Sequence, residues 1–152
     1  NDNAQTLHDR LAALGARAVT EALAGLQKGS LSAETQDESL ACYAKKLHKA
    51  EAEIDWRQAA PQIARQVAAF NPWPVAQTRY KEEVLRIWEA RALDESSSKP
   101  AGTVINADRQ GIDIACGEGV LRLQRLQRPG GKPQDVADFL NANSVEGVVL
   151  GG

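Results

Sequence analysis

Lysine and arginine side chains are the residues of this chain whose types and spacing could bind a ligand. Lys45, Lys46 and Lys49 fall within five residues, with His48 among them. Cations grouped in this way on a flexible segment can neutralise successive phosphates of a nucleic-acid backbone. A solvated linker can have the same composition, so the cluster alone leaves both interpretations open.

A second basic group lies in and after a predicted strand, Val120–Leu126. Because side chains alternate along a strand, its leucines face inward, and the arginines lie on or near the outer face and the strand's exit. The pattern predicts a basic stripe on the surface. Its members are Arg122, Arg125 and Arg128. Lys132 follows in the next turn.

The charge is unevenly distributed along the 152 residues, whose formal net charge is −2. Residues 43–132 contain 15 Lys or Arg and 11 Asp or Glu, whereas the two ends together contain 3 and 9. The middle is therefore mildly basic. This excess is smaller than that of a dedicated nucleic-acid tail, and it also fits an ordinary solvated surface.

Motifs for catalysis, cofactors and metals are missing from the sequence. It has no G-x-S-x-G elbow, no G-x-x-x-x-G-K-[ST] phosphate loop and no histidine pair with metal-ligand spacing. His8 lies on a predicted amphipathic helix, and His48 lies in the lysine cluster. Cys42 and Cys116 are far apart and near no other ligands, which favours free thiols. We therefore expect no catalytic, cofactor-binding or metal-binding residue in this chain.

The elements that would position these residues begin with a helical segment. Apolar residues at helical spacing predict one or two amphipathic helices over Thr6–Lys28, interrupted at Gly15. Thr6 and Asp9 form a capping-box signature, and Gly29 suits a left-handed C-terminal cap. The polar residues 30–50 predict an extended linker.

A second helix is predicted to start at Asp55, with Gln58 completing its cap, and to end near Asn71, because Pro72 disfavours helical geometry in the residue before it. Arg57 and Arg65 lie off its apolar stripe and so stay available to solvent or a ligand. Trp73 is expected to pack at the core or the sheet edge, as an aromatic anchor where the sheet begins.

Short alternating segments with tight turns then predict a small antiparallel barrel. A short closing helix, capped by Asp135, follows. The fold class is thus α+β: a small OB-like Greek-key β-barrel with a flanking helix, preceded by an N-terminal helical segment and an extended linker. The five predicted strands are Val75–Thr78, Glu83–Leu93, Thr103–Ala107, Ile112–Cys116 and Val120–Leu126.

Several motifs give the chain a family resemblance. The run Ala69-Phe70-Asn71-Pro72-Trp73-Pro74, with its flanks, resembles the C-terminal part of methionyl-tRNA formyltransferases. The leading block Thr6–Leu11 is similar to the last helices of the catalytic domain in that family. The resemblance covers nearly the whole chain. It continues through Tyr43–Leu47, Ile54–Trp56, Arg86–Trp88, Pro100–Val104, Gly111-Ile112, Gly117–Gly119 and Gly130–Lys132.

The resemblance implies a part of a larger enzyme. The family transfers a formyl group from 10-formyltetrahydrofolate to the amino group of methionyl initiator tRNA, and its catalytic residues and folate pocket lie in a Rossmann-like N-terminal domain. The expected organisation is 1–29 from the end of that domain, 30–50 as linker and 51–152 as an OB-like tRNA-binding domain. The start at Asn1 and the absence of methionine also suggest a fragment.

Further expectations concern partners and location. The tRNA-binding residues would be drawn from the basic groups described above, the cosubstrate would bind outside this chain, and the protein would be a cytoplasmic monomer. No apolar run approaches the roughly 20 residues of a membrane-spanning helix. Family members usually carry arginines after the final helix, whereas Asn141–Val145 has none. The expected tRNA-binding set is Lys45, Lys46, Lys49, Arg57, Arg65, Arg122, Arg125, Arg128 and Lys132.

Two other function classes fit parts of the sequence. A free-standing OB-like module could bind single-stranded nucleic acid without catalysis, provided that aromatic residues lie on the barrel surface. A related formyltransferase could act on an amino sugar or another small amine. The Asn71–Pro74 motif argues against this third possibility, because the sugar-modifying relatives do not usually carry it.

Overall fold

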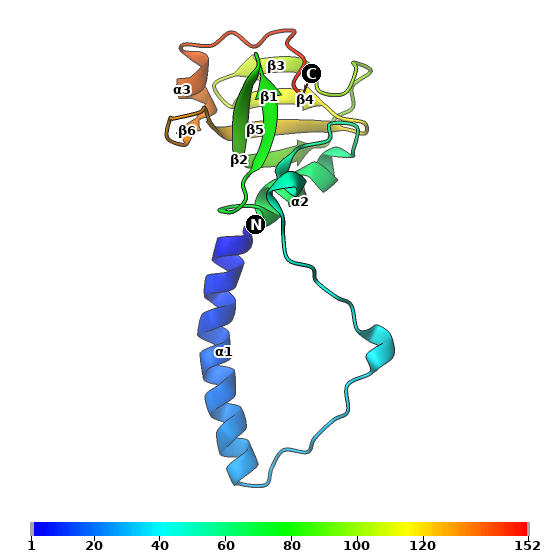
Figure 1. Cartoon of the computed structure of the whole chain (residues 1–152), viewed down its shortest axis with the longest axis vertical. Helices are drawn as coiled ribbons and strands as arrows, with labels where there is room; N and C mark the ends of the chain where they lie inside the picture. The colour runs from blue at the N-terminus through cyan, green and yellow to red at the C-terminus, as the bar shows by residue number, and fades with distance from the viewer. Residues whose placement is uncertain (1, 152) are drawn as a thin grey trace.

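Alternation of apolar and polar residues builds one curled antiparallel sheet in the computed structural model, which describes residues 2–151 (Figure 1). The strand order is β1-β2-β5-β4-β3, with β6 paired to β5. All five predicted strands are confirmed within two residues at each end, and β6 is additional. The strands are β1 (Ala76–Tyr80), β2 (Glu83–Leu93), β3 (Val104–Asp108), β4 (Gly111–Ala115), β5 (Val120–Gln127) and β6 (Gln134–Asp135).

The α+β class is confirmed, but the barrel is open between β1 and β3, the two ends of the strand order. Leu150 and Gly151 occupy this seam. Leu150 N donates to the Gly102 carbonyl just before β3, and Gly151 N donates to the Arg79 carbonyl on β1, at 2.8 and 3.0 Å. The tail therefore covers both edges without adding a regular strand.

The helix α2 (Ala60–Ala69) closes one side of the core with Ala60, Ile63 and Val67. It starts five residues later than predicted, because residues 55–58 form a turn in which Asp55 accepts from the Arg57 amide. Gly117 N donates to the carbonyls of Trp56 and Gln58, which locks that turn against the β4–β5 connection. A Cβ on Gly117 would lie 1.8 Å from the Arg57 carbonyl oxygen, so only glycine fits there.

The short helix α3 (Val136–Leu140) covers the end of the sheet with Val136 and Phe139. The Phe139 ring meets Tyr80 on β1 edge to face, with 5.9 Å between ring centroids. Asp135 occupies the N-cap position as predicted, but its side chain makes no capping hydrogen bond. Packing therefore holds α3 in place more than capping does.

The helix α1 (Ala4–Gln27) is one continuous element that projects away from the sheet (Figure 1). Gly15 does not interrupt it, and the predicted Thr6–Asp9 cap is wrong. Asn3 is the N-cap, and it forms a capping box with Thr6. Gly29 takes left-handed backbone with φ of +67°, which confirms the predicted stop. No residue of α1 is buried.

The linker between α1 and the sheet is extended, as predicted. It contains only two short 3-10 turns, η1 (Glu38–Leu40) and η2 (Lys49–Ala52). Ala52 and Ile54 are the first residues after α1 to enter the core. Among residues 2–151, no helix combines the length and the hydrophobicity needed to cross a membrane.

Candidate nucleic-acid interface

The structure divides the nine predicted binding residues into two groups. Four arginines form ion pairs with carboxylates: Arg57, Arg122, Arg125 and Arg128. The other five make no such pair within the described residues and keep their charge available to a ligand. These five are Lys45, Lys46, Lys49, Arg65 and Lys132.

Arg122 is not on an open basic stripe as the sequence suggested. Its guanidinium contacts the Asp113 carboxylate through Nε and Nη2, at 2.6 and 2.7 Å, and the two side chains are only 13% and 5% exposed. Asn106 donates to the same carboxylate at 3.2 Å. A Cβ on Gly111 would lie 2.4 Å from Arg122 Cγ, so the glycine makes room for this pair. Arg122 therefore has a structural role, because its ion pair joins β5 to β4.

The remaining paired arginines are exposed, and their charge is locally balanced. Arg57 contacts Asp55 at 2.8 and 3.0 Å in the turn before α2. Arg128 contacts Glu83 at 2.8 Å, which raises the pKa of the guanidinium. Arg125 and Glu89 are 3.7 Å apart on β5 and β2. Exposed pairs of this kind contribute little to stability, and a phosphate could compete for the arginines.

One cavity brings two cations together with two aromatic side chains. It has a volume of about 370 Å³ and lies where η2, the turn before β1, and strands β1 and β2 meet. We call it the Trp73 pocket. Its charged members are Lys49 and Arg86, and its aromatic members are Trp73 and Trp88. The other lining residues are Ala52, Pro72, Pro74, Val75 and Gln77.

Trp73 is 50% exposed, so it does not pack in the core, and the expected core position is wrong. Phe70 and Val75 on either side are buried and supply the apolar anchors at this corner. Between them Pro72 and Trp73 are exposed, and a proline stands on each side of Trp73. All three of these residues line the pocket.

Arg86 was missed as a candidate by the sequence reasoning. It stands on β2 between the buried residues Leu85 and Ile87, so it faces outward. It also lines a neighbouring cavity of about 240 Å³ together with Gln127 and Arg128. The alternation Leu85-Arg86-Ile87 was a signal that could have found it. We call the continuous face carrying Lys49, Arg86 and Arg128 the Lys49–Arg128 surface.

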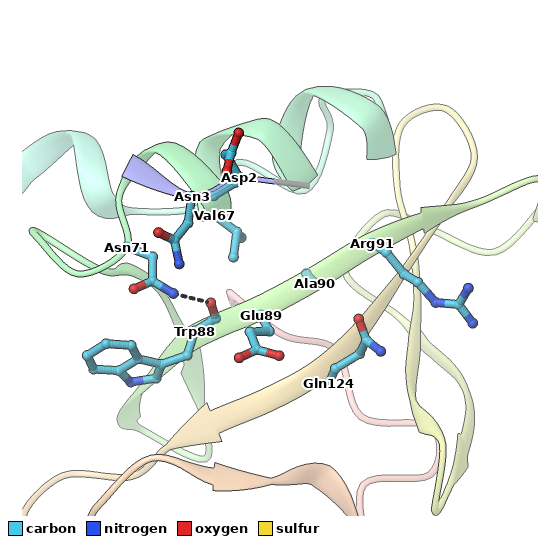
Figure 2. A pocket seen from close by; sticks show the side chains of 10 residues that line it. Asp2, Asn3, Val67, Asn71, Trp88, Glu89, Ala90, Arg91 and Gln124 are labelled. Atoms are coloured by element: carbon cyan, nitrogen blue, oxygen red, sulfur yellow. Dashed lines mark hydrogen bonds between the residues drawn. The ribbon is translucent and has the colours of Figure 1, made fainter. Parts of the chain in front are cut away.

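A third cavity, of about 340 Å³, lies between the first residues of the chain, α2 and β2 (Figure 2). Asn71 Nδ2 donates to the Trp88 carbonyl at 2.9 Å on its edge. Asp2 and Glu89 line it against a single cation, Arg91. This charge balance suits a phosphate less well than the Trp73 pocket does. Among residues 2–151 no cluster of side chains could hold a metal ion.

Two relatives are similar to this chain in sequence over nearly its whole length. The methionyl-tRNA formyltransferase of Coxiella burnetii (strain RSA 493 / Nine Mile phase I) is 49% identical over 142 residues, covering 93% of this chain and 45% of the relative. The protein of that name from Methylococcus capsulatus is 46% identical over 151 residues, covering 99% of this chain and 49% of the relative. The chain thus spans about half the length of these relatives.

Among solved structures, HypX from Aquifex aeolicus has the same fold in part of its length. One variant gives a TM-score of 0.58 at 20% identity, covering 82% of this chain and 23% of HypX. HypX in complex with tetrahydrofolic acid gives 0.57 at 20% identity, covering 80% and 22%. Residues 46–144 match the family described as formyl transferase, C-terminal domain. The chain therefore belongs to the formyl transferase C-terminal domain family.

Proposed function

We propose that this chain is the tRNA-binding portion of a methionyl-tRNA formyltransferase. The complete enzyme transfers a formyl group from 10-formyltetrahydrofolate to the amino group of methionyl initiator tRNA, at the start of translation. The observation that carries the proposal is the 46–49% identity to proteins of that name over at least 93% of this chain. The cytoplasmic location and the monomeric state remain predictions.

The two ends of this chain belong to different domains of the enzyme, which have different roles. Residues 1–29 belong to the end of a Rossmann-like catalytic domain, 30–50 to the linker and 51–152 to the tRNA-binding domain. In support, six large apolar residues of α1 are at least 44% exposed, from Leu7 to Leu26. Such a stripe normally faces a partner surface. Catalysis and binding of the folate cosubstrate take place outside this chain.

The tRNA is held mainly through its phosphates. Lys45, Lys46 and Lys49 approach one side of the sheet domain from the linker, and Arg86 extends that charge along the Lys49–Arg128 surface. Arg65 and Lys132 add further free cations on α2 and after β5. Arg57, Arg125 and Arg128 would exchange a carboxylate for a phosphate, whereas Arg122 stays in its pair with Asp113. Contacts of this kind position the tRNA without reading its sequence.

The test is binding of initiator tRNA at several salt concentrations. We expect affinity to fall linearly with salt on logarithmic axes. Replacing Lys45 and Lys46 by glutamine should reduce the slope by about two, because each lysine accounts for about one phosphate contact. Lys28→Gln, at the far end of α1, is the matched control and should leave the slope unchanged. A chain that shows no binding at low salt, or no salt dependence, would refute the proposal.

The exposed Trp73 gives some weight to the alternative, a free-standing module for single-stranded nucleic acid. The two functions differ in their preferred ligand. A formyltransferase portion should bind folded tRNA more tightly than an unstructured RNA of equal length. The reverse preference would favour the free-standing module.

A further inference from the structure

We propose that the Trp73 pocket is a subsite for one unpaired nucleotide of RNA. The indole of Trp73 stacks on the base, and Lys49 and Arg86 bind the adjoining phosphate. This inference rests on the proposed function, because it names the part of the tRNA that the sheet domain would hold. It adds recognition of an unpaired base to the phosphate contacts already described.

The first observation is the contrast among the three tryptophans. Trp56 is 5% exposed, and its Nε1 donates to Thr78 Oγ1 at 3.0 Å. Trp88 is half-buried, and its Nε1 donates to Gln127 Oε1 at 2.9 Å. Trp73 is 50% exposed, and its indole N–H has no acceptor within the described residues. An exposed indole ring is what a stacking platform requires.

The second observation is the charge around that indole. Lys49 and Arg86 line the pocket, no carboxylate does, and neither cation has an ion-pair partner among residues 2–151. Two acidic groups are near without lining the pocket: Glu53, which accepts from the pocket residue Gln77 at 3.1 Å, and Glu51, which lies with Lys49 on η2. The residues that line the pocket itself carry two positive charges and no negative one. A cationic rim beside an aromatic face matches a nucleotide, which joins a phosphate to a flat base.

The third observation is the size of the pocket. Its volume of about 370 Å³ lies in the range of small-molecule sites. A paired base inside an A-form helix exposes only its edge, so it cannot stack on a side chain. The pocket therefore fits an unpaired nucleotide from a loop or an end better than a helical stem.

The experiment measures binding of three probes to the whole chain: initiator tRNA, a single-stranded oligoadenylate of eight nucleotides and an RNA duplex of eight base pairs. Trp73→Ala should weaken tRNA and oligoadenylate binding by roughly 5- to 150-fold, which is the usual range for losing one stacked base. Duplex binding should not change. Because Trp73 is exposed, circular dichroism should show an intact fold.

Two matched variants separate stacking from other effects. Trp73→Phe keeps an aromatic face and should bind within about threefold of the parent chain. Val149→Ala removes another half-exposed apolar residue, in the C-terminal tail, and should have no effect. Saturating oligoadenylate should also quench more of the tryptophan fluorescence in the parent chain than in Trp73→Phe, in which Trp88 is the one tryptophan left in the pocket lining.

The outcomes distinguish this inference from the proposed function. Salt-dependent tRNA binding that Trp73→Ala leaves unchanged would overturn the subsite alone. So would equal losses in Trp73→Ala and Trp73→Phe, since the ring face would then not matter, or equal losses for duplex and single strand. A parent chain that binds no tRNA at low salt would refute the proposed function, and the subsite with it.

Discussion

The helix α1 and the sheet domain use amphipathic sequence in opposite ways. In α1 the leucines follow a clear helical spacing, yet none of its residues is buried. In the sheet domain, from Ile54 to Leu150, apolar residues of α2, α3 and the five long strands form one core. A backbone hydrogen bond of 3.4 Å from Gln5 N to the Asn71 carbonyl joins the start of α1 to the domain.

This difference separates two sources of structure. Local signals suffice to define α1, since the Asn3 cap starts it and Gly29 stops it. Its apolar stripe contributes no burial in this chain, and isolated helices depend on propensity and capping alone. The sheet domain instead depends on contacts between residues far apart in sequence. The two regions should therefore respond to different substitutions.

The largest contrast is expected between two leucine truncations. Leu123 on β5 is 0% exposed, whereas Leu23 on α1 is 62% exposed. Leu123→Ala should lower the free energy of unfolding by about 3 to 4 kcal/mol, because it removes a fully packed side chain. Leu23→Ala should change it by less than about 0.5 kcal/mol. Denaturant unfolding followed by tryptophan fluorescence reads the sheet domain, and similar losses would show that α1 packs on it in solution.

The next contrast lies inside the sheet domain, between its buried and exposed ion pairs. Asp113→Ala should cost about 2 to 3 kcal/mol, since it leaves the nearly buried Arg122 without its partner. Glu83→Ala, which frees the half-exposed Arg128, should cost at most about 1 kcal/mol. The same unfolding experiment measures both. Equal costs would contradict the burial of the Asp113–Arg122 pair.

The sequence predicted the strands well because their signals are local. The bounds of β2 matched at both ends, and expected glycines flank the turns at β4, with Gly111 as its first residue and Gly117 and Gly119 after its end. The start of α2 was predicted too early because Asp55 is a residue type that often caps helices, whereas here its side chain accepts a hydrogen bond within a turn. What holds that turn is Gly117, about 60 residues away, and no local pattern reports such a contact. The seam filled by Leu150 and Gly151 was missed for the same reason.

The sequence predicted that the candidate site would be basic, but it did not predict correctly which residues form it. Residue types and spacing indicated basic residues near the linker and β5. They could not reveal that Arg122 forms an ion pair with Asp113, because that pairing depends on the order of the strands in the sheet. Nor could they place Trp73, since tryptophan suits a core and an exposed platform equally well. The outward position of Arg86 could have been predicted, because it alternates with the apolar residues Leu85 and Ile87.

The two cysteines offer a chemical comparison of the linker and the sheet domain. Cys42 is exposed in the linker, whereas Cys116 is buried after β4, where desolvation raises the pKa of the thiol to about 11. At pH 8 only about one Cys116 thiol in a thousand is ionised, and the thiolate is the reactive form. A disulfide reagent should modify Cys42 at least tenfold faster.

The pH dependence checks this explanation. Between pH 8 and pH 9 the rate at Cys116 should rise about tenfold, because the thiolate fraction increases tenfold per pH unit below the pKa. Denaturant should expose Cys116 to rapid reaction. Equal native rates for the two thiols would indicate that the end of β4 opens readily. Peptide mapping after partial labelling assigns each rate to its cysteine.

The smallest effect is expected at the start of α1. Asn3→Ala removes the side chain that accepts from the Thr6 amide at 2.9 Å, and an N-cap of this type contributes about 1 kcal/mol to its helix. Because α1 has no buried residue, the loss should appear as reduced helical circular dichroism at 222 nm, while the unfolding midpoint of the sheet domain stays constant. Asn3→Asp, which keeps an acceptor, should preserve the helical signal. A shifted midpoint in Asn3→Ala would mean that α1 and the sheet domain fold as one unit, and that the helix owes its stability to contacts rather than to its cap.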